Sequence, residues 1–350
     1  PLAQYFGILV CWAVVWNLFR HLKYSPERAF MLYLRCATVS AIVGVYQQIT
    51  YLLQIEALYD IRWLTVGAAG LDVSGPFLRV PSLFTEPSYF AAFLMPALYF
   101  AILRLSGASR RLSIGRSVLF ILALMCTFST IGYIGLVLCV LFAIRLSLRN
   151  MLLGLSLIAA LLSIAGSNPA ISSRMSSIPS ALQADLQGDE NLSALINGLN
   201  LSIAKNMLSD RPLTGMGLGA YRVYSLEYLA EFLAGNEALT SKVNEMFEQL
   251  TLADGGSMYL RLPTELGIGG LLLLAWLIHR NSRPHVPQPH RDIATAALLF
   301  ILVFSIRSGQ LIRFDIIFFC SLYSLIWLQN APVAARRPPP IPIHRKAVND

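Results

Sequence analysis

Residues 118–144 read VLFILALMCTFSTIGYIGLVLCVLFAI, a stretch without one charged side chain. Ser129 and Thr130, followed by Gly132, divide it into two apolar segments, as a tight turn between two helices would. Apolar segments of roughly 20 residues are typical of helices that cross a membrane. Each half is short for a full span, so the two helices are either tilted or paired as a broken hairpin buried in protein.

Similar apolar segments recur along the 350-residue chain, which is 56% hydrophobic and 13% charged. Soluble domains carry about 25% charged residues. We therefore expect an all-α fold, a polytopic transmembrane helical bundle. Its nine expected helices lie at about residues 2–19, 29–54, 88–104, 115–129, 131–147, 150–166, 257–279, 292–306 and 311–328. Residues 1–330 would form one integral-membrane domain, and residues 331–350 a disordered cytoplasmic tail.

The chain begins at Pro1 inside an apolar segment, so we expect further sequence before it. All five cysteines lie in apolar segments without metal-type spacing, which favours small buried apolar side chains over a disulfide framework.

Lysine and arginine are concentrated in alternate loops between the apolar segments. The residues concerned are Arg20, Lys23, Arg28; Arg104, Arg110, Arg111, Arg116; Arg145, Arg149; Arg280, Arg283, Arg291; and Arg336, Arg337, Arg345, Lys346. The positive-inside rule assigns these loops to the cytoplasm. The net charge of +8 is then explained by an anionic leaflet rather than by nucleic acid. Residues 55–87, the turn at Ser129, residues 167–256 and residues 307–310 would share the outer face.

The long polar interval at residues 167–256 is the predicted periplasmic loop. Leu192, Leu195, Leu199, Ile203 and Met207 recur at helical spacing, with Asn191 as a plausible N-cap. The aromatic residues Tyr221, Tyr224, Tyr228 and Phe232 indicate a second helix. These helices either pack on the bundle or contact lipid or substrate.

Arginines predicted to lie on the outer face are the main signal for a site, because positive charge is otherwise depleted there. They are Arg62, Arg79, Arg174, Arg211, Arg222, Arg261, Arg307 and Arg313. A guanidinium group binds phosphate oxygens through two parallel hydrogen bonds and stays charged near lipid. Arg211 and Arg261 are the strongest candidates for a pyrophosphate site. The alternative is that the arginines extend toward the membrane surface or pair with acidic residues.

Two carboxylates accompany these arginines. Glu86 lies where a helix re-enters the membrane, with Pro87 suited to the first turn. It either caps that helix, as Thr85 could, or serves as a general base or ligand for a sugar hydroxyl. Glu265 lies one turn after Arg261 and could be its ion-pair partner, although intramembrane charges also suggest function.

The glycines at 215, 217 and 219 let the backbone pass close to a ligand or a helix. Gly215, Gly217 and Gly219 do not form a dinucleotide fingerprint, because no strand precedes them. All five histidines fall on the predicted cytoplasmic side, which excludes a Ser-His dyad or a histidine-ligated zinc on the outer face. The outer position of the long loop excludes cytosolic cofactors such as ATP or nucleotide sugars, so we expect no cofactor.

Several short motifs together resemble the O-antigen ligase/polymerase superfamily of bacterial envelopes. They are FTEPS (84–88), TFST (127–130), PLTGMGLG (212–219), YLR and ELG (259–267) and RSGQ (307–310), in that order over residues 80–325. The resemblance implies a metal-independent, inverting glycosyltransferase with a GT-C-like fold in the bacterial inner membrane. Its partners would be membrane lipids and an oligosaccharide on undecaprenyl pyrophosphate, with a chain-length regulator and a flippase as further candidates.

The resemblance also implies roles for individual residues. Arg211 and Arg261, with Arg79 and Arg307, would hold the pyrophosphate leaving group, and Glu86 or else Asp254 would orient or deprotonate the acceptor hydroxyl. Ligases of the superfamily usually carry a His-Asn pair before the helix that follows the long loop, and this chain has Asp254 and Gly255 there. That departure favours a polymerase of repeat units. A ligase, a lipid-linked oligosaccharide flippase or other transporter, and a non-catalytic scaffold are the alternatives.

Overall fold

The computed structural model describes most of the chain between residues 25 and 329. The described residues are 6, 10, 13–17, 21, 25–61, 63, 71, 73–74, 76–143, 192–234, 240, 256–281, 287–288, 290–309 and 313–329. The expected helix at 150–166, most of the one at 2–19, the cap Asn191, the candidate base Asp254 and the tail 331–350 lie outside these residues.

Helices make up almost all of the regular structure in the described residues, which confirms the all-α prediction. They are α2 (Pro26–Leu52), α3 (Glu56–Tyr59), α4 (Pro87–Leu105), α5 (Ile114–Thr127), α6 (Thr130–Ala143), α9 (Leu192–Asp210), α10 (Ala220–Leu233), α12 (Met258–Asn281), α13 (His290–Arg307) and α14 (Phe314–Gln329). A small antiparallel hairpin of β1 (Val73–Ser74) and β2 (Phe77–Leu78) is the exception.

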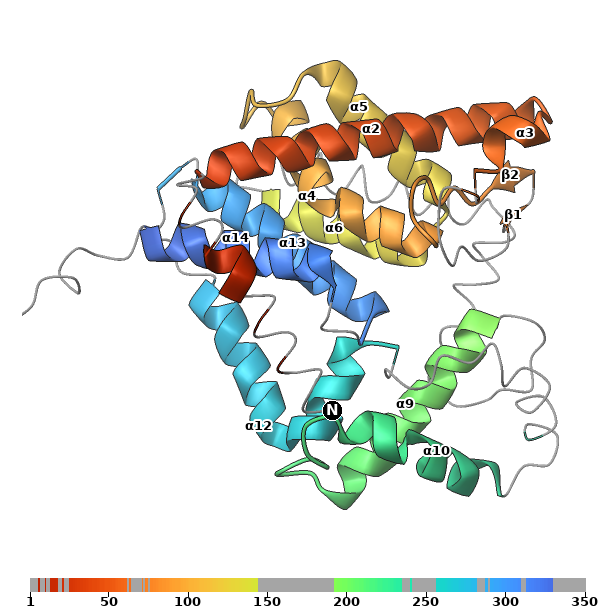
Figure 1. Cartoon of the computed structure of the whole chain (residues 1–350), viewed down its shortest axis with the longest axis vertical. Helices are drawn as coiled ribbons and strands as arrows, with labels where there is room; N and C mark the ends of the chain where they lie inside the picture. The colour runs from red at the N-terminus through yellow and green to blue at the C-terminus, as the bar shows by residue number, and fades with distance from the viewer. Residues whose placement is uncertain are drawn as a thin grey trace, which may run out of the picture.

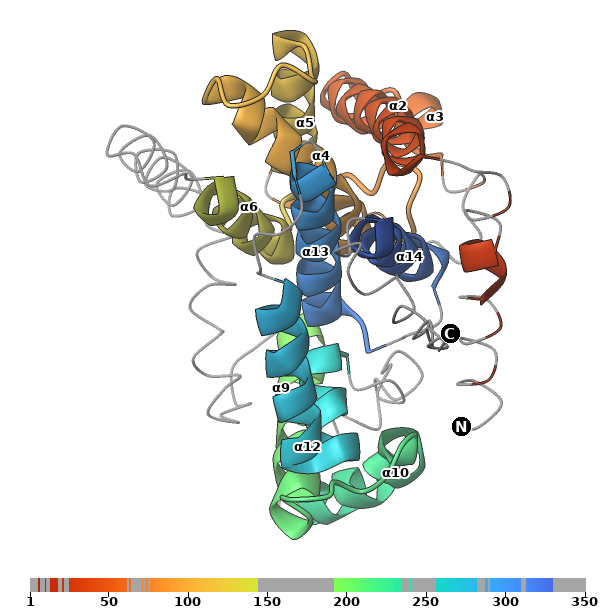
Figure 2. The ribbon, with the colours of Figure 1, turned by 90° about the vertical axis from the view of Figure 1, so that its left-hand side faces the viewer.

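Six helices, α2, α4, α5, α6, α13 and α14, form one bundle, and α9, α10 and α12 lie along one side of it (Figure 1). The view turned by 90° shows the same division, with α9, α10 and α12 grouped beyond α13 (Figure 2). The bundle core is rich in aromatic rings. Phe30, Phe90, Phe100, Phe300 and Phe319 are fully buried in it.

The helices begin where local sequence favours it. Ser25 and Ser113 cap α2 and α5, since each hydroxyl accepts a hydrogen bond from the backbone N–H three residues on, at 3.2 and 3.3 Å. Pro87 begins α4, where its missing N–H costs nothing. The predicted tight turn between α5 and α6 is present, and Phe128 adopts a left-handed conformation there.

Contacts between loops define two ends of the bundle. At one end, Glu27 approaches Arg111 at 3.8 Å and His290 at 3.7 Å. At the other end, the backbone N–H of Val80 donates to the carbonyl of Cys126 at 3.0 Å, beside the α5–α6 turn. The starts of α2 and α13 and the loop between α4 and α5, all assigned from sequence to the cytoplasmic face, therefore meet at the first end, and Val80 meets the end of α5 at the second. We call the second the Glu86 end.

Two described helices, α2 and α4, are long and apolar enough to cross a membrane, and α5, α6 and α14 are shorter apolar helices. The core helix of a soluble protein passes the same test, and α4 is mostly buried. On α2, however, the face turned away from the bundle is also apolar, since Leu32, Val39, Ile42 and Ile49 are each more than half exposed.

Helices α9 and α10 pack through a small core of their own. Leu199, Ile203 and Met207 of α9 are fully buried against α10, as their helical spacing predicted. The aromatic stripe of α10 mostly faces this core, because Tyr221 is buried and donates its hydroxyl to the side-chain oxygen of Asn200 at 2.9 Å. Tyr228 hydrogen-bonds to Asp210, and that bond to a carboxylate raises the tyrosine pKa to about 12.

Candidate functional site

Glu86, Ser88 and Arg307 form a hydrogen-bonded cluster at the Glu86 end. Arg307, the last residue of α13, donates from Nη2 to Glu86 Oε2 at 2.5 Å and from Nε to Ser88 Oγ at 3.1 Å. The Ser88 hydroxyl in turn donates to the same Glu86 oxygen at 3.0 Å. The antiparallel packing of α4 on α13 therefore brings together two residues that are far apart in sequence and were both candidates from sequence alone.

The Glu86 carboxylate does not cap its helix. Glu86 has the extended backbone of an N-cap residue, but its side chain makes no capping hydrogen bond. Oε2 accepts both hydrogen bonds of the cluster, whereas Oε1 accepts none from the residues that the structure describes. The side chain is 34% exposed. One oxygen is thus held in place and the other is open to accept a proton or a hydroxyl hydrogen bond.

An aromatic pair lies next to this cluster and carries a second arginine. The rings of Tyr89 and Phe304 stack with their centroids 5.8 Å apart and their planes at an angle of 22°. The guanidinium carbon of Arg313 lies 4.4 Å from the Tyr89 centroid and 5.0 Å from that of Phe304. Arg307 lies over the same Tyr89 ring at 5.2 Å. Asp315 accepts from Nε and Nη2 of Arg313, both at 3.3 Å.

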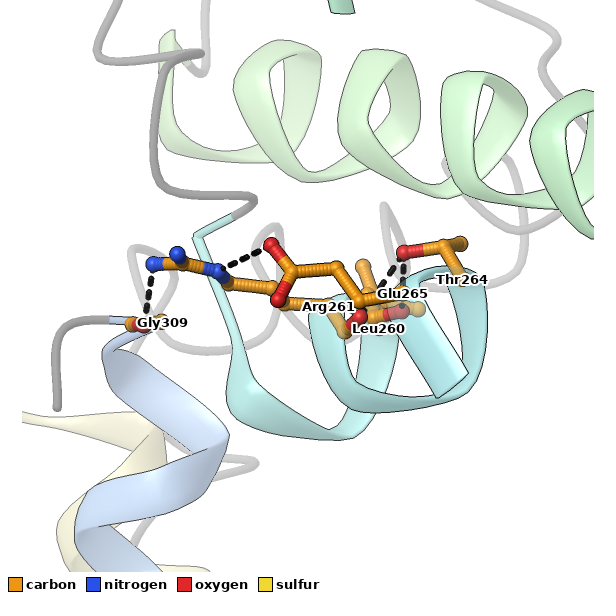
Figure 3. A network of polar contacts seen from close by, with 5 residues as sticks. All are labelled: Leu260, Arg261, Thr264, Glu265 and Gly309. Carbon is orange, nitrogen blue, oxygen red and sulfur yellow. Dashed lines mark hydrogen bonds and ion pairs between the residues drawn. The ribbon is translucent and has the colours of Figure 1, made fainter. Parts of the chain in front are cut away.

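Arg261 and Glu265 form a second ion pair, which is buried (Figure 3). Arg261 Nε donates to Glu265 Oε1 at 2.8 Å, and Nη1 donates to the carbonyl of Gly309 at 2.9 Å. Their side chains are 9% and 4% exposed. The predicted pairing along one helix face is confirmed, and Arg261 also contacts Gly309, which lies two residues after Arg307 in the chain.

The start of α12 is fastened to the end of α13 by side chains that donate to backbone carbonyls. Ser257 donates to Ser305 at 3.0 Å, and Tyr259 donates to Leu302 at 3.1 Å. The last four carbonyls of a helix lack partners within the helix, so the hydrogen bond from Ser257 to Ser305 stabilises the end of α13, while Tyr259 contacts the helix one turn earlier. Arg261 adds a positive charge near the negative end of the α13 dipole. These contacts fix the position from which Arg307 reaches Glu86.

The glycine-rich segment packs against a break in α12. Gly267 has a non-helical backbone, φ 62° and ψ −150°, so the expected single helix at 257–279 is interrupted there. Met216 and Gly217 donate their N–H groups to the carbonyls of Thr264 and Glu265 at 2.8 and 2.9 Å. Ile268 donates to the carbonyl of Pro212 at 2.9 Å. The segment therefore supplies partners for backbone groups that the break leaves without helical ones.

Two glycines make this close approach possible. A Cβ atom built on Gly215 would lie 2.5 Å from the backbone of Glu265, and one on Gly267 would lie 2.5 Å from the nitrogen of Gly215. Both also have positive φ. The sequence left open whether these glycines allow close approach to a ligand or to a helix. Gly215 allows close approach to helix α12. Gly219 begins α10 with φ 78°, whereas Gly217 has open space around it.

Arg211 and Arg79 are the two remaining arginine candidates for pyrophosphate binding among the described residues. Arg211 is exposed at the end of α9, and its side chain makes no hydrogen bond or ion pair with the described residues. Arg79 follows β2 and is half-buried beside the α5–α6 turn. The roles of both in holding a pyrophosphate stay predictions.

Sequence reasoning assigned no role to Tyr89, Phe304 or Asp315. Asp315 lies two residues from Arg313, one of the arginines singled out, and Tyr89 lies one residue beyond FTEPS. Phe304 has no such signal. Among the described residues, no three His, Cys, Asp or Glu side chains gather closely enough to hold a metal ion.

Comparisons with protein-family models, curated protein sequences and solved structures found no match to this chain.

Proposed function

We propose that this protein is an integral-membrane glycosyltransferase that polymerises lipid-linked oligosaccharide repeat units, with Glu86 as the catalytic base. The observation that carries the proposal is the difference between the two oxygens of the Glu86 carboxylate. Arg307 and Ser88 hold Oε2, while Oε1 is open on a partly exposed side chain. The motifs that resemble the O-antigen ligase/polymerase superfamily include the segments of Glu86 and Arg307.

In the proposed reaction, a hydroxyl of the acceptor sugar attacks the anomeric carbon of the donor. Glu86 Oε1 takes the hydroxyl proton as the new C–O bond forms, and the bond from the anomeric carbon to the phosphate oxygen breaks. The lipid pyrophosphate leaves with the bonding electron pair, and Glu86 later gives its proton to water. Attack opposite the leaving group inverts the anomeric centre. Arg307 stabilises the charge that develops on the pyrophosphate.

Arg261 acts differently in this proposal. Binding of pyrophosphate by Arg261 would require it to release Glu265 or Gly309, which would leave a buried charge without its partner. We assign to it the fixing of α12 against the end of α13. Arg211 and Arg79 remain candidates for more distant contacts with the donor.

A membrane setting is part of the proposal. The apolar outer face of α2 suits contact with lipid, since a helix that is apolar all round is either buried or spans a membrane. The Glu86 end would then face the periplasm, as the distribution of lysine and arginine predicts. Arg211→Cys tests this orientation. Its exposed thiol should react with a membrane-impermeant maleimide in spheroplasts, and no labelling before lysis would place residue 211 in the cytoplasm and contradict the predicted orientation.

The activity is tested by extension of a purified lipid-linked repeat unit by the purified protein in lipid nanodiscs, without metal or nucleotide sugar. The expected product is a ladder of polymers still attached to the lipid carrier. A single transfer to an added lipid A core acceptor, with no ladder, would show a ligase instead. Movement of the intact donor across a vesicle membrane without any new glycosidic bond would show a transporter.

A further inference from the structure

The guanidinium of Arg313 packs against two aromatic rings and pairs with Asp315 through two long hydrogen bonds. It lies over both Tyr89 and Phe304, within 5.0 Å of each ring centroid. Phe304 is fully buried in the bundle core, so this platform cannot shift easily. Arg307 lies over the same Tyr89 ring. The last residue of α13 and the residue before α14 thus present two guanidinium groups at one aromatic side chain, beside Glu86.

Arg313 pairs with Asp315 through two long hydrogen bonds near the surface. Both hydrogen bonds to Asp315 are long, at 3.3 Å, and both side chains are partly exposed. Asp315 also accepts the backbone N–H of Ile316 at 3.0 Å at the start of α14. Because a carboxylate is favourably placed at a helix N-terminus, Asp315 keeps a compensating environment if Arg313 turns away from it. The Nη1 group of Arg313 has no hydrogen bond to the described residues.

The rings would also keep Arg313 in position during the exchange. A cation over an aromatic face leaves its in-plane N–H groups directed outward, where they can form two parallel hydrogen bonds with phosphate oxygens. Lysine offers the charge without this planar fork. The platform therefore favours arginine and an oxyanion with several equivalent oxygens.

We propose that Arg313, positioned by Tyr89 and Phe304, is a second binding residue for the phosphate groups of the lipid-linked donor, and that it exchanges Asp315 for phosphate oxygens when the donor binds. This rests on the proposed function and adds to it a binding residue and two positioning residues. Glu86 acts at the acceptor hydroxyl, Arg307 stabilises the charge that develops on the pyrophosphate, and Arg313 adds a second contact to the pyrophosphate.

The test uses the full chain in phosphatidylcholine nanodiscs and compares wild type with Arg313→Lys, Tyr89→Leu and Tyr89→Phe. Two quantities are measured: the KM for the lipid-linked donor in the extension assay, and the concentration of inorganic pyrophosphate that inhibits by half. Arg313→Lys should raise both by about tenfold with kcat little changed, because it weakens binding in ground and transition states alike. Tyr89→Leu should behave similarly. Tyr89→Phe keeps the ring and should restore most of the lost affinity.

The outcomes separate this inference from the proposed function. An active wild type whose KM and pyrophosphate inhibition are unchanged in Arg313→Lys would overturn the inference alone. Equal losses in Tyr89→Phe and Tyr89→Leu would also overturn it, since the hydroxyl and not the ring would then matter. A wild type that extends no donor contradicts the proposed function. In that case, a rise in the unfolding midpoint with pyrophosphate that Arg313→Lys abolishes would still support the anion site.

A further comparison shows whether Arg313 binds the phosphates of the donor or those of membrane lipid headgroups. The same variants are compared in phosphatidylglycerol nanodiscs. If Arg313→Lys loses only stabilisation by this anionic lipid and keeps wild-type inhibition by pyrophosphate, Arg313 binds lipid headgroups, and the assignment to the donor is wrong. Should Tyr89→Leu not fold, as judged by its unfolding midpoint, the Arg313→Lys measurement decides by itself.

Discussion

The molecule contains two arginine–glutamate pairs of the same chemistry in very different surroundings. Arg261 and Glu265 are nearly inaccessible, whereas Arg307 and Glu86 are about one-third exposed. Both residues of the buried pair come from α12, and Arg261 also donates a hydrogen bond to the carbonyl of Gly309, just after the end of α13. The exposed pair joins two helices and leaves one carboxylate oxygen open. The difference teaches that accessibility, rather than the presence of an arginine, separates a pair that a ligand could reach from one that holds helices together.

The largest effect is expected from Glu86→Gln. The amide keeps the shape of the side chain but cannot take the acceptor proton, so kcat should fall by about 10²–10⁴-fold. The unfolding free energy should change by only about 1 kcal/mol or less, because a partly exposed pair contributes little. Chain extension and thermal unfolding measure the two. Glu56→Gln, the same change at an exposed residue of α3, is the matched control, and equal activity of both variants would remove Glu86 from the mechanism.

Arg261→Ala should give the opposite result. It leaves the Glu265 carboxylate buried without its cation, which costs about 3–5 kcal/mol. We expect a lower unfolding midpoint and a loss of activity in proportion to the loss of folded protein. Arg261→Met combined with Glu265→Leu should recover stability, because no buried charge then remains. An Arg261→Ala protein that is fully stable but has a greatly raised KM for the donor would instead place Arg261 in the binding site.

The contact between the glycine-rich segment and the backbone of Glu265 can be disrupted without changing either charged side chain of the buried pair. Gly215→Ala puts a methyl group 2.5 Å from the Glu265 backbone and should destabilise the fold by about 1–3 kcal/mol. Gly269→Ala lies in the same helix with open space around it and should stabilise α12 by up to about 1 kcal/mol. Thermal unfolding of the two variants compares them directly. Equal midpoints would contradict the close approach of the glycine-rich segment to α12.

The smallest effect is expected from Arg211→Ala. Its exposed guanidinium has no partner among the described residues, and an interaction in water is weak. The KM for the donor should rise by about threefold or less, and the unfolding midpoint should not move. A large rise in KM, not rescued by Arg211→Lys, would show that a bidentate phosphate contact forms at Arg211 and that the donor reaches further than the exposed pair.

The sequence predicted the helices of the bundle well because their apolar segments are bounded by polar residues and proline. The Arg261–Glu265 ion pair could also be predicted, from its spacing along one helix face, whereas Glu86 and Arg307 were separate candidates and their contact left no signal in the sequence. The Tyr89–Phe304 platform could not, because contacts between rings and a cation from three separate segments leave no spacing signature. The break at Gly267 was hidden as well, since glycine in an apolar segment does not reveal the partner it approaches.

The interlocking of residues 212–217 with the break in α12 has a consequence for biosynthesis. The glycine-rich segment leaves the ribosome well before residues 264–268, so the carbonyl and N–H groups that pair with it do not yet exist. Helices α9 and α10 can form their own small core early, because it uses only residues already made. Their attachment must wait for α12, and the fastening of α12 must wait for α13. The region around Arg307 and Glu86 is therefore among the last to be completed.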